Sequence, residues 1–370
     1  MEILWLNWRD LRHPKAGGAE VYTHEVARRL VDRGHGVTLF VAAAPGIPAS
    51  ERIDGVRIVR RGGAFSTRLR ARQWLKALDG SFDVLVEEIN TLPYAGRRWS
   101  GLPTLVVVHQ IAREVWWWEA PWYVAPFGRA LEPVMLRAAR GPAIALSEST
   151  RSDLVAAGFD PAAVRVIYPG ISTSASPPVG VPVEHELFAY VGRLAPSKRV
   201  DHCIRALGAL RRAGQPARLA VVGHGDPRVA ERLRQVATDE GVAAHVRFHD
   251  YLSDRERDRL LASATAVVMA SVREGWGMSI TEANALGTPA VVYRRPGLCD
   301  STRDGKTGIV VDPNPLSLAK GMARLMDEPG LRDRLARGAR EWAAQLTWEA
   351  TADAVEESLV TMVAHGGGRG

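Results

Sequence analysis

Two glutamates, Glu274 and Glu282, are separated by seven residues in the stretch EGWGMSITE, where a glycine stands on each side of Trp276. Carboxylates suit hydrogen bonds from sugar hydroxyls, whereas a phosphate would be repelled by their charge. The glycines let backbone N–H groups approach a ligand closely. A second interpretation needs no ligand, because Ser279 and Glu282 have the spacing of a helix capping box and Glu274 would be a solvated loop acid. Spacing alone leaves both interpretations open.

The elements on either side of this stretch predict how it is presented. The apolar run Ala266–Met269 predicts a strand before it, and Ile280–Leu286 predicts a helix after it that stops at Gly287. A strand, a glycine-rich loop and a helix N-terminus favour a phosphorylated ligand, because free N–H groups and the helix dipole point toward it. The stretch is therefore a candidate site for such a ligand.

Two cations bracket another predicted strand-to-helix loop. Arg193 and Lys198 lie in GRLAPSKR, between a predicted strand, Leu187–Val191, and a predicted helix, Val200–Ala213. Fixed cations at a helix N-terminus suit a diphosphate, Arg through its planar fork and Lys as a point charge. The alternative is a pair of exposed basic residues. Gly223, in Gly-His-Gly after another predicted strand, is only a partial glycine fingerprint.

The N-terminal half contributes three further candidates. Gly17 and Gly18 separate a predicted strand, Glu2–Leu6, from a predicted helix, Ala19–Arg33, without the G-x-G-x-x-G pattern of dinucleotide sites. His109 follows the run TLVVV, which places it at a strand's carboxyl end, the edge where open α/β sheets bind ligands. The alternatives are a flexible turn for the glycines and a structural role for the histidine.

Aromatic and basic residues concentrate in two other segments. The segment REVWWWEAPWY holds Trp116, Trp117, Trp118 and Trp122. Such a cluster suits an acceptor platform for sugars or lipids, or a membrane-interface patch, with core packing accounting for two of the rings. Val56–Leu78 carries seven basic residues and no acid, which fits an anionic surface or substrate, or a solvated face.

Composition sets the broad class of the protein. A length of 370 residues predicts about two domains, and 46% apolar content is ordinary for a globular protein. The net charge of +7 suits nucleotides, anionic lipid or nucleic acid. No apolar run approaches the ~20 residues of a membrane span, and MEILWLNW lacks the basic start of a signal peptide. The only cysteines, Cys203 and Cys299, have no metal-like spacing, so we expect a reducing cytoplasm and no disulfide framework.

Strand-like and helix-like runs alternate along both halves of the chain. This alternation, with near-continuous Val, Ile and Leu runs, predicts doubly wound parallel sheets. The segment Ser172–Val183, rich in Ser and Pro, predicts a linker between domains. The strands expected besides those above are Val37–Ala42, Val56–Val59, Val84–Val86, Thr104–Val108, Ala143–Leu146, Val164–Ile167, Leu219–Val222, Val246–His249 and Ala290–Tyr293.

Eight segments in this order resemble retaining glycosyltransferases of family 4: GGAEVYTHEVARRL, VVVHQ, LSESTRSDL with AGF, VIYPGI, YVGRLAPSKRVD, VVGHGD, EGWGMSITEANALGTPAV and DGKTGIVV. The resemblance covers nearly the whole length. It implies an α/β protein of the GT-B fold, with two facing Rossmann-like domains and an interdomain cleft. The expected organisation is an acceptor-binding domain over 1–171 completed by helix 347–364, a linker over 172–185, a nucleotide-sugar-binding domain over 186–346, and a disordered tail over 365–370.

The resemblance also implies roles for individual residues. Glu282 would bind the ribose hydroxyls and Glu274 the donor sugar, while Arg193 and Lys198 would neutralise the departing diphosphate. His109 would lie near the transferring sugar. The remaining donor contacts would come from Gly17, Gly18, Gly223, Gly275, Trp276, Gly277, Met278 and Ser279, and the tryptophan cluster would bind the acceptor.

The implied reaction moves a hexose from a UDP- or GDP-linked sugar to an acceptor hydroxyl with retention. The acceptor would be a lipid-linked molecule, a polysaccharide or a natural product. Cations and N–H dipoles would stabilise the leaving diphosphate without a metal or other cofactor. We expect a nucleotide sugar and an unidentified acceptor as partners, no nucleic acid, and a cytoplasmic protein at or near the inner face of an anionic membrane. The alternatives are a nucleotide-sugar epimerase or phosphorylase of this fold, an inactive sugar-nucleotide-binding partner, and, from charge alone, a nucleic-acid-binding protein.

Overall fold

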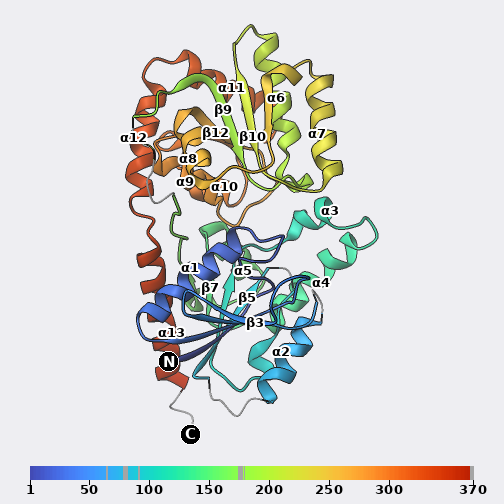
Figure 1. The fold of residues 1–370 in the computed structure, drawn as a ribbon, viewed down its shortest axis with the longest axis vertical. Coiled ribbons are helices and arrows are strands. Elements are labelled where there is room, and N and C mark those ends of the chain that lie inside the picture. The colour runs from blue at the N-terminus through green and yellow to red at the C-terminus, as the bar shows by residue number, and fades with distance from the viewer. Residues whose placement is uncertain (64–65, 78–81, 91, 174–177, 179, 367–370) are drawn as a thin grey trace. The chain divides into compact units, whose positions relative to one another are not determined.

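Residues 1–63, 66–77, 82–90, 92–173, 178 and 180–366 are described by the computed structural model of the chain. The chain divides into two compact units (Figure 1). The first unit contains Met1–Arg113, Trp122–Gly170 and Thr347–Gly370, and the second contains Glu114–Pro121 and Ile171–Leu346. Each unit is an α/β domain built on one largely or wholly parallel sheet.

The first unit contains an eight-stranded sheet with the order β3-β4-β2-β1-β5-β6-β7-β8. Among the described strands, only β3 and β4 pair antiparallel, at one edge of the sheet. The strands are β1 (Glu2–Leu6), β2 (Gly36–Val41), β3 (Ser50–Ile53), β4 (Val56–Arg60), β5 (Val84–Ile89), β6 (Thr104–Val108), β7 (Ala143–Ala145) and β8 (Val164–Val166). The sequence predicted all of them except β3, whose residues SERI are mostly polar and carry no apolar signal.

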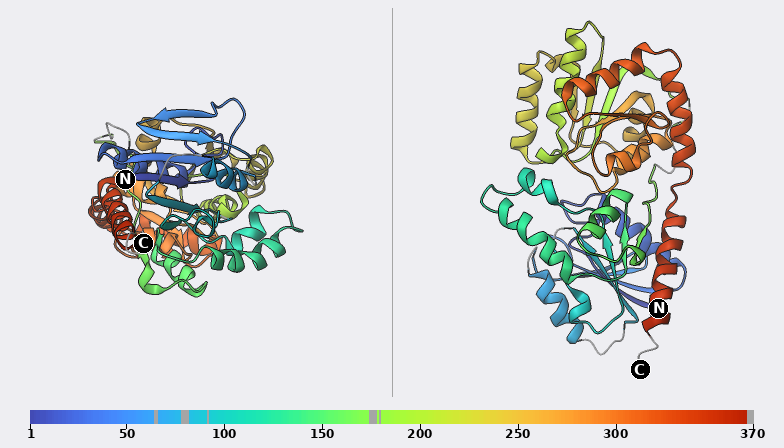
Figure 2. Two further views of the ribbon diagram at one scale, coloured as in Figure 1. Left: turned by 90° about the horizontal axis from the view of Figure 1, so that it is seen from below. Right: turned by 180° about the vertical axis from the view of Figure 1, so that it is seen from behind.

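The α-helices described in the first unit are α1 (Gly18–Asp32), α2 (Thr67–Lys76), α4 (Ala125–Ala138), α5 (Glu148–Ala156) and α13 (Trp348–Gly366). The last of them lies against α1, although more than 300 residues separate the two (Figure 2). Arg29 Nη2 lies 2.8 Å from a Glu349 carboxylate oxygen, and Arg33 Nη1 lies 2.7 Å from Glu356. Gly170 allows Trp348 to pack closely, because a Cβ there would come within 2.4 Å of the Trp348 nitrogen.

The second unit contains a six-stranded parallel sheet with the order β11-β10-β9-β12-β13-β14. Its strands are β9 (Glu184–Val191), β10 (Arg218–Val222), β11 (Val246–His249), β12 (Ala264–Met269), β13 (Ala290–Tyr293) and β14 (Gly308–Val311). Its helices are α3 (Trp116–Glu119), α6 (Val200–Arg212), α7 (Pro227–Asp239), α8 (Asp254–Ser263), α9 (Met278–Ala285), α10 (Leu298–Ser301), α11 (Pro315–Asp327) and α12 (Leu331–Ala343).

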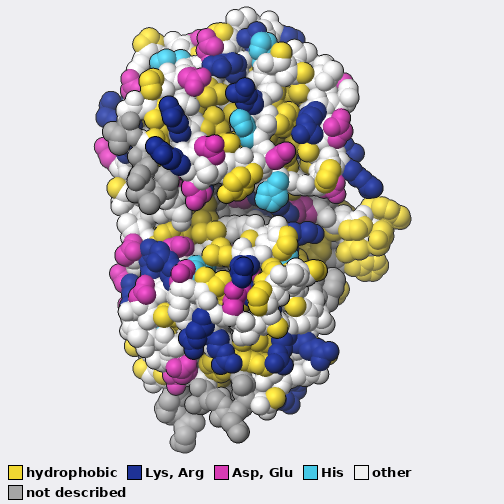
Figure 3. Space-filling view, in the orientation of Figure 1, with side chains coloured by type: hydrophobic (Ala, Val, Ile, Leu, Met, Phe, Trp, Pro, Cys, Tyr) yellow, Lys and Arg dark blue, Asp and Glu magenta, His cyan; other side chains and the backbone are white. Residues whose placement is uncertain are grey.

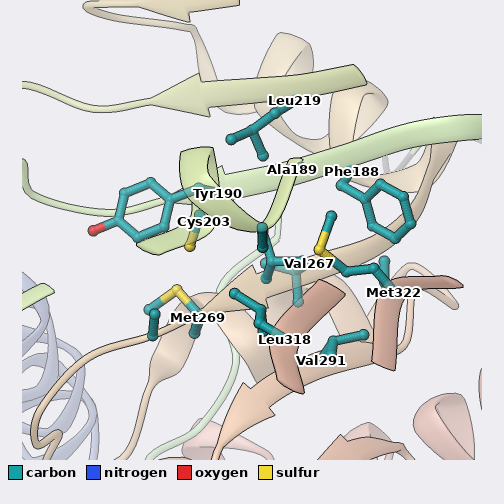
Figure 4. Packing of buried hydrophobic residues seen from close by; sticks show 14 of the residues in the cluster. Phe188, Ala189, Tyr190, Cys203, Leu219, Val267, Met269, Val291, Leu318 and Met322 are labelled. Atoms are coloured by element: carbon teal, nitrogen blue, oxygen red, sulfur yellow. The ribbon is translucent and has the colours of Figure 1, made fainter. Parts of the chain in front are cut away.

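The core of the second unit lies between the sheet and its helices (Figure 4). Phe188, Ala189 and Tyr190 on β9 are fully buried, as is Val267 on the neighbouring β12. Leu318 of α11 packs in the same cluster. Central parallel strands of this kind are buried on both faces, so the loops at their carboxyl ends are held on a rigid support.

The predicted linker and the predicted tail each differ from the structure at one boundary. Strand β9 begins at Glu184, inside the expected linker over 172–185, because its first residues are charged and exposed and hide the strand from a hydrophobic pattern. Helix α13 extends to Gly366, into the expected tail over 365–370. Residues 174–177 and 179 of the linker and 367–370 of the tail lie outside the described residues.

Candidate functional site

The loop that follows β12 holds Glu274 and leads into α9. Gly277 is the N-cap of this helix and has a φ of 95°, a left-handed conformation that favours glycine. The predicted capping box between Ser279 and Glu282 is wrong: Ser279 already lies within the first turn of α9, and the N-cap makes no side-chain hydrogen bond. The helix N-terminus therefore lacks a side-chain cap, which leaves the ligand-free interpretation of Glu282 without support.

Lys198 and Glu274, predicted from separate motifs, form an ion pair. The Nζ of Lys198 lies 2.7 Å from both carboxylate oxygens of Glu274. Ser271 Oγ donates to one of the same oxygens at 2.7 Å. The side chains of Lys198 and Glu274 are only 19% and 11% exposed, so the pair is shielded from solvent more than a surface salt bridge. Lys198, a cation suited to a phosphate, and Glu274, an acid suited to a sugar hydroxyl, are thus in direct contact.

Arg193, the second predicted cation, contacts the carboxylate of Glu119 in α3. Its Nη2 lies 2.9 and 2.8 Å from the two carboxylate oxygens. Ser197 Oγ also donates to Glu119. The hydroxyl of Tyr190 donates to the Arg193 carbonyl at 3.0 Å, which fixes the backbone of the loop after β9. Arg193 therefore binds one carboxylate of the protein itself, through a side chain that is 56% exposed.

Glu282 has an unusual protonation equilibrium. Burial of its carboxyl raises the pKa of Glu282 to about 7, opposed by the positive charge of Arg257 and reinforced by Asp258 and Asp254. Arg257 itself donates to the buried carboxylate of Asp258 at 2.9 Å. A pKa raised in this way is common for acids at functional sites.

The other predicted donor residues of the second unit differ in exposure. Trp276 is buried and its ring packs against Trp342 at 6.3 Å between centroids, so its side chain belongs to the core. Gly275, Gly277, Met278 and Ser279 are partly exposed. Gly223 lies where a Cβ would approach the Gly192 carbonyl oxygen to 2.0 Å, which explains the glycine through backbone packing alone. At Trp276 and at Gly223, therefore, a ligand could contact only backbone atoms.

His109 lies at the carboxyl end of β6, as predicted, and is 8% exposed. Its Nε2 lies 3.2 Å from Glu88 Oε2, at the end of the neighbouring strand β5. The ring of Tyr22 meets the imidazole edge-on at 5.2 Å. Thr150 Oγ1 lies 3.2 Å from the His109 carbonyl oxygen and fixes the backbone.

Gly17 and Gly18 are both exposed at the start of α1. The Gly17 N–H donates to Glu20 Oε2 at 2.7 Å, in a capping arrangement within the first turn. Glu20 is buried, and burial raises the pKa of its carboxyl. An acid of the protein itself therefore accepts one of the N–H groups that the sequence assigned to a ligand.

The four tryptophans are distributed over both units. Trp116, Trp117 and Trp118 form most of α3 in the second unit, whereas Trp122 belongs to the first. The expectation that core packing accounts for two of them is wrong, because none is buried; Trp117 is 57% and Trp122 is 85% exposed. Short helices cannot bury consecutive side chains against one core. Arg199 stacks over Trp118 at 4.6 Å.

Sequence reasoning missed four polar partners of the site: Ser271, Ser197, Glu119 and Glu88. Ser271 and Glu88 lie at or just beyond strand carboxyl ends, a signal that could have identified them. Nothing in the sequence pairs Glu119 with Arg193. In the described part of the chain, no three His, Cys, Asp or Glu side chains are grouped as metal ligands would be.

Two family models match the chain. Residues 16–175 match Glycosyltransferase Family 4, and residues 173–342 match Glycosyl transferases group 1. Among curated proteins, the D-inositol 3-phosphate glycosyltransferases of Thermomonospora curvata and Frankia alni are each 30% identical to it. These alignments cover 92% and 93% of this chain and 90% and 94% of the relatives.

Solved structures share the fold across the whole length. Sucrose-phosphate synthase from Thermosynechococcus elongatus superposes with a TM-score of 0.80 at 21% identity, covering 98% of this chain and 99% of that one. Anabaena HepE in complex with UDP-glucose superposes with a TM-score of 0.75 at 20% identity, covering 98% and 100%. The two Rossmann-like α/β domains are thus those of the GT-B fold, which confirms the predicted fold class.

Proposed function

Since this chain belongs to glycosyltransferase family 4, and so is a glycosyltransferase with a nucleotide-sugar donor, we propose that it moves a hexose from a UDP- or GDP-linked sugar to an acceptor hydroxyl with retention. The observation that carries the proposal is the contact between Lys198 and Glu274 at 2.7 Å. It joins a cation suited to a diphosphate and an acid suited to a sugar hydroxyl beside the N-terminus of α9.

Each charged residue of the second unit has a distinct role in this proposal. Lys198 and Arg193 neutralise the diphosphate as the bond to the sugar breaks, and the N-terminus of α9 adds its dipole. Glu274, released from Lys198 by the competing phosphate, accepts hydrogen bonds from the donor sugar. Glu282 accepts hydrogen bonds from the ribose hydroxyls. The pKa of its carboxyl, raised to about 7, is consistent with this role, because hydrogen bonds from a ligand favour the ionised form.

The first unit contributes His109, Gly17 and Gly18. In the proposed reaction, the acceptor attacks the face of the sugar from which the diphosphate leaves, and the departing phosphate takes the acceptor proton. His109 hydrogen-bonds a substrate hydroxyl near the transferring sugar. The glycine pair binds a phosphate or sugar once Glu20 gives up the Gly17 N–H. No divalent metal is needed, so the reaction should proceed in EDTA.

A transfer assay tests the proposal. The protein is incubated with UDP- and GDP-hexoses in EDTA, with D-inositol 3-phosphate, lipid-linked sugars and oligosaccharides as acceptors. We expect acceptor-dependent release of one nucleoside diphosphate and a product with the donor's anomeric configuration by NMR. Conversion of the donor sugar without any acceptor would identify an epimerase, and nucleotide binding without either reaction would identify an inactive partner.

Glu119 is expected to compete with the diphosphate for Arg193. Because the ion pair is partly exposed, removing it should raise the affinity for UDP or GDP by a few-fold, up to about 5-fold. Titration calorimetry of Glu119→Gln measures this, with Glu186→Gln, which removes an equal charge from the start of β9, as the control. The affinity for the corresponding monophosphate should change less. Equal or weaker diphosphate binding by Glu119→Gln would contradict the competition.

We also propose that an anionic membrane surface binds the exposed face of α4. Hydrophobic side chains gather in this region in the space-filling view (Figure 3). Trp122 is 85% and Phe127 is 70% exposed, and Leu131 continues the apolar stripe one helical turn further. Arg129 and Arg137 are exposed on the same helix. The other exposed apolar residues in and before α4 are Tyr123, Val124 and Val134.

The charge of this segment favours anionic lipid. Its only acid between Trp122 and Ala138 is Glu132, which is buried and accepts the N–H groups of Ala112 and Arg113. The exposed side chains are thus apolar or positive, the combination that inserts at a charged lipid interface. Within the described residues, no helix has both the length and the hydropathy needed to cross a bilayer.

Vesicle co-sedimentation tests the membrane surface. Binding to vesicles containing phosphatidylglycerol should fall at least ~10-fold in the double variant Phe127→Glu, Leu131→Glu, because insertion of two apolar side chains is lost. Val360→Glu, at a half-exposed apolar position on α13, serves as the matched control. Wild-type binding that is equally strong to neutral phosphatidylcholine, or unaffected by the double variant, would rule out this surface.

A further inference from the structure

The structure contains a buried carboxylate beside His109 that no role above uses. Glu88 is 2% exposed at the end of β5, and its two oxygens have different partners. Oε1 lies 2.9 Å from the indole nitrogen of Trp5 and 2.6 Å from the Thr23 hydroxyl. Oε2 lies 3.2 Å from His109 Nε2. We propose that Glu88 is a positioning residue that fixes the tautomer of His109.

The hydrogen-bond inventory determines which tautomer this is. An ionised carboxylate only accepts, so Nε2 of a neutral His109 must carry the proton that it donates to Glu88. The other ring nitrogen, Nδ1, is then unprotonated. Nδ1 has no hydrogen-bond partner in the described part of the chain. The ring therefore presents a hydrogen-bond acceptor, which can receive the proton of a substrate hydroxyl but cannot donate to one.

The surroundings hold this arrangement rigidly. Trp5 and Thr23 are themselves buried, and Thr23 lies 2.8 Å from the side-chain nitrogen of Asn7 at the end of β1. The Glu88 carboxylate is thus held through Oε1, the oxygen that does not contact His109. Tyr22, whose buried hydroxyl has no hydrogen-bond partner among the described residues, packs edge-on against the imidazole and restricts its rotation. Three neighbouring strand ends and α1 together determine the orientation of one imidazole.

Glu88→Gln is the informative variant because it keeps the shape and inverts the tautomer. Trp5 and Thr23 both lie beside Oε1, and the indole N–H can only donate, so the amide oxygen of the introduced side chain must remain there. The amide NH₂ then faces His109 and donates to Nε2. The proton of the imidazole must move to Nδ1, which becomes a donor. Thr23→Val is the control, since it removes the hydroxyl beside Oε1 of Glu88 but leaves the contact between Glu88 and His109.

Proton–nitrogen NMR correlation of the histidine rings reads the tautomer directly, with His109→Asn identifying the signal. We expect the Nε2–H form in the wild type and in Thr23→Val, and the Nδ1–H form in Glu88→Gln. An Nδ1–H form in the wild type, or an unchanged tautomer in Glu88→Gln, would overturn the inference whatever the substrate is.

The kinetic consequence rests on the proposed transferase function. Glu88→Gln should lower kcat by about 10-fold or more with little change in KM for the donor, though less than the ~10⁴ seen where a wrong tautomer disables a histidine that transfers protons. Thr23→Val, which keeps the contact between Glu88 and His109, should lose less of kcat than Glu88→Gln. If the tautomer inverts and kcat does not change, the positioning role is wrong. If no donor reacts with any variant while the tautomers behave as expected, the proposed function fails and the hydrogen-bond assignment stands.

Discussion

Replacing Lys198 with methionine is expected to lower the rate of diphosphate release from the donor by about 10²–10³-fold. The reason is electrostatic: the transition state carries charge on the departing diphosphate, and removal of one preorganised partner of such charge costs about that factor. Release of the nucleoside diphosphate under saturating donor and acceptor measures the effect. A rate within about 3-fold of wild type would contradict the role of Lys198.

A second effect of this variant must be separated from the first. Without Lys198, the carboxylate of Glu274, only 11% exposed, has no cation beside it, which should destabilise the second unit by up to about 3 kcal/mol. The double variant Lys198→Met, Glu274→Gln removes the uncompensated charge. We expect it to recover most of the melting temperature and none of the activity. Recovery of activity in the double variant would mean that the single variant fails through folding alone.

Glu282→Gln is expected to lose about 100-fold in affinity for the nucleotide, because hydrogen bonds from two ribose hydroxyls to a carboxylate are each worth about 1.5–3 kcal/mol. The pH dependence follows from the pKa of Glu282, which is raised to about 7 from a reference of 4.5. Ionisation improves the carboxylate as an acceptor, so wild-type affinity should rise as pH increases through 7. The affinity of Glu282→Gln should be flat over the same range. Calorimetric titrations at several pH values measure both.

The same raised pKa predicts a change in stability. The folded protein holds the Glu282 proton more tightly than the unfolded chain, so the free energy of unfolding falls as pH rises from about 4.5 to 7. Above pH 7 the ionised carboxyl lowers the free energy of unfolding by up to about 3 kcal/mol. Glu282→Gln should therefore melt higher than wild type at pH 8 and equally at pH 4.5. Glu231→Gln, at an exposed position on α7, should show no such difference.

The sequence predicted the fold because its strands are nearly continuous apolar runs. Such runs are characteristic of buried parallel strands, and the loop after each one must lie at the carboxyl edge of the sheet. This rule placed His109 directly after a strand, and Arg193, Lys198 and Glu274 in the loops that follow β9 and β12. It failed for β3 (Ser50–Ile53), which lies at the edge of the sheet. This segment is a strand because it pairs with β4, and none of its side chains is buried.

Contacts between distant residues could not be predicted in the same way. Sequence reasoning assigned Lys198 and Glu274 to separate parts of a ligand, whereas in the structure this cation and this acid pair with each other. Glu119 contacts Arg193 although 74 residues separate them, and Glu88 contacts His109 from the neighbouring strand. The raised pKa of Glu282 depends on burial of its carboxyl in three dimensions. Local pattern contains none of these distances.

The most direct test of the donor site is a thermal-shift panel of UDP, GDP, ADP and TDP in EDTA, on wild type and Glu282→Ala. A ligand at about 100 times its Kd adds ~2.7 kcal/mol of stability. One nucleotide should raise the melting temperature of the wild type without metal and leave that of Glu282→Ala unchanged. If the same nucleotide stabilised both proteins equally, Glu282 would not be its ribose contact; if none stabilised the wild type, the second unit would not hold a nucleoside diphosphate at this site.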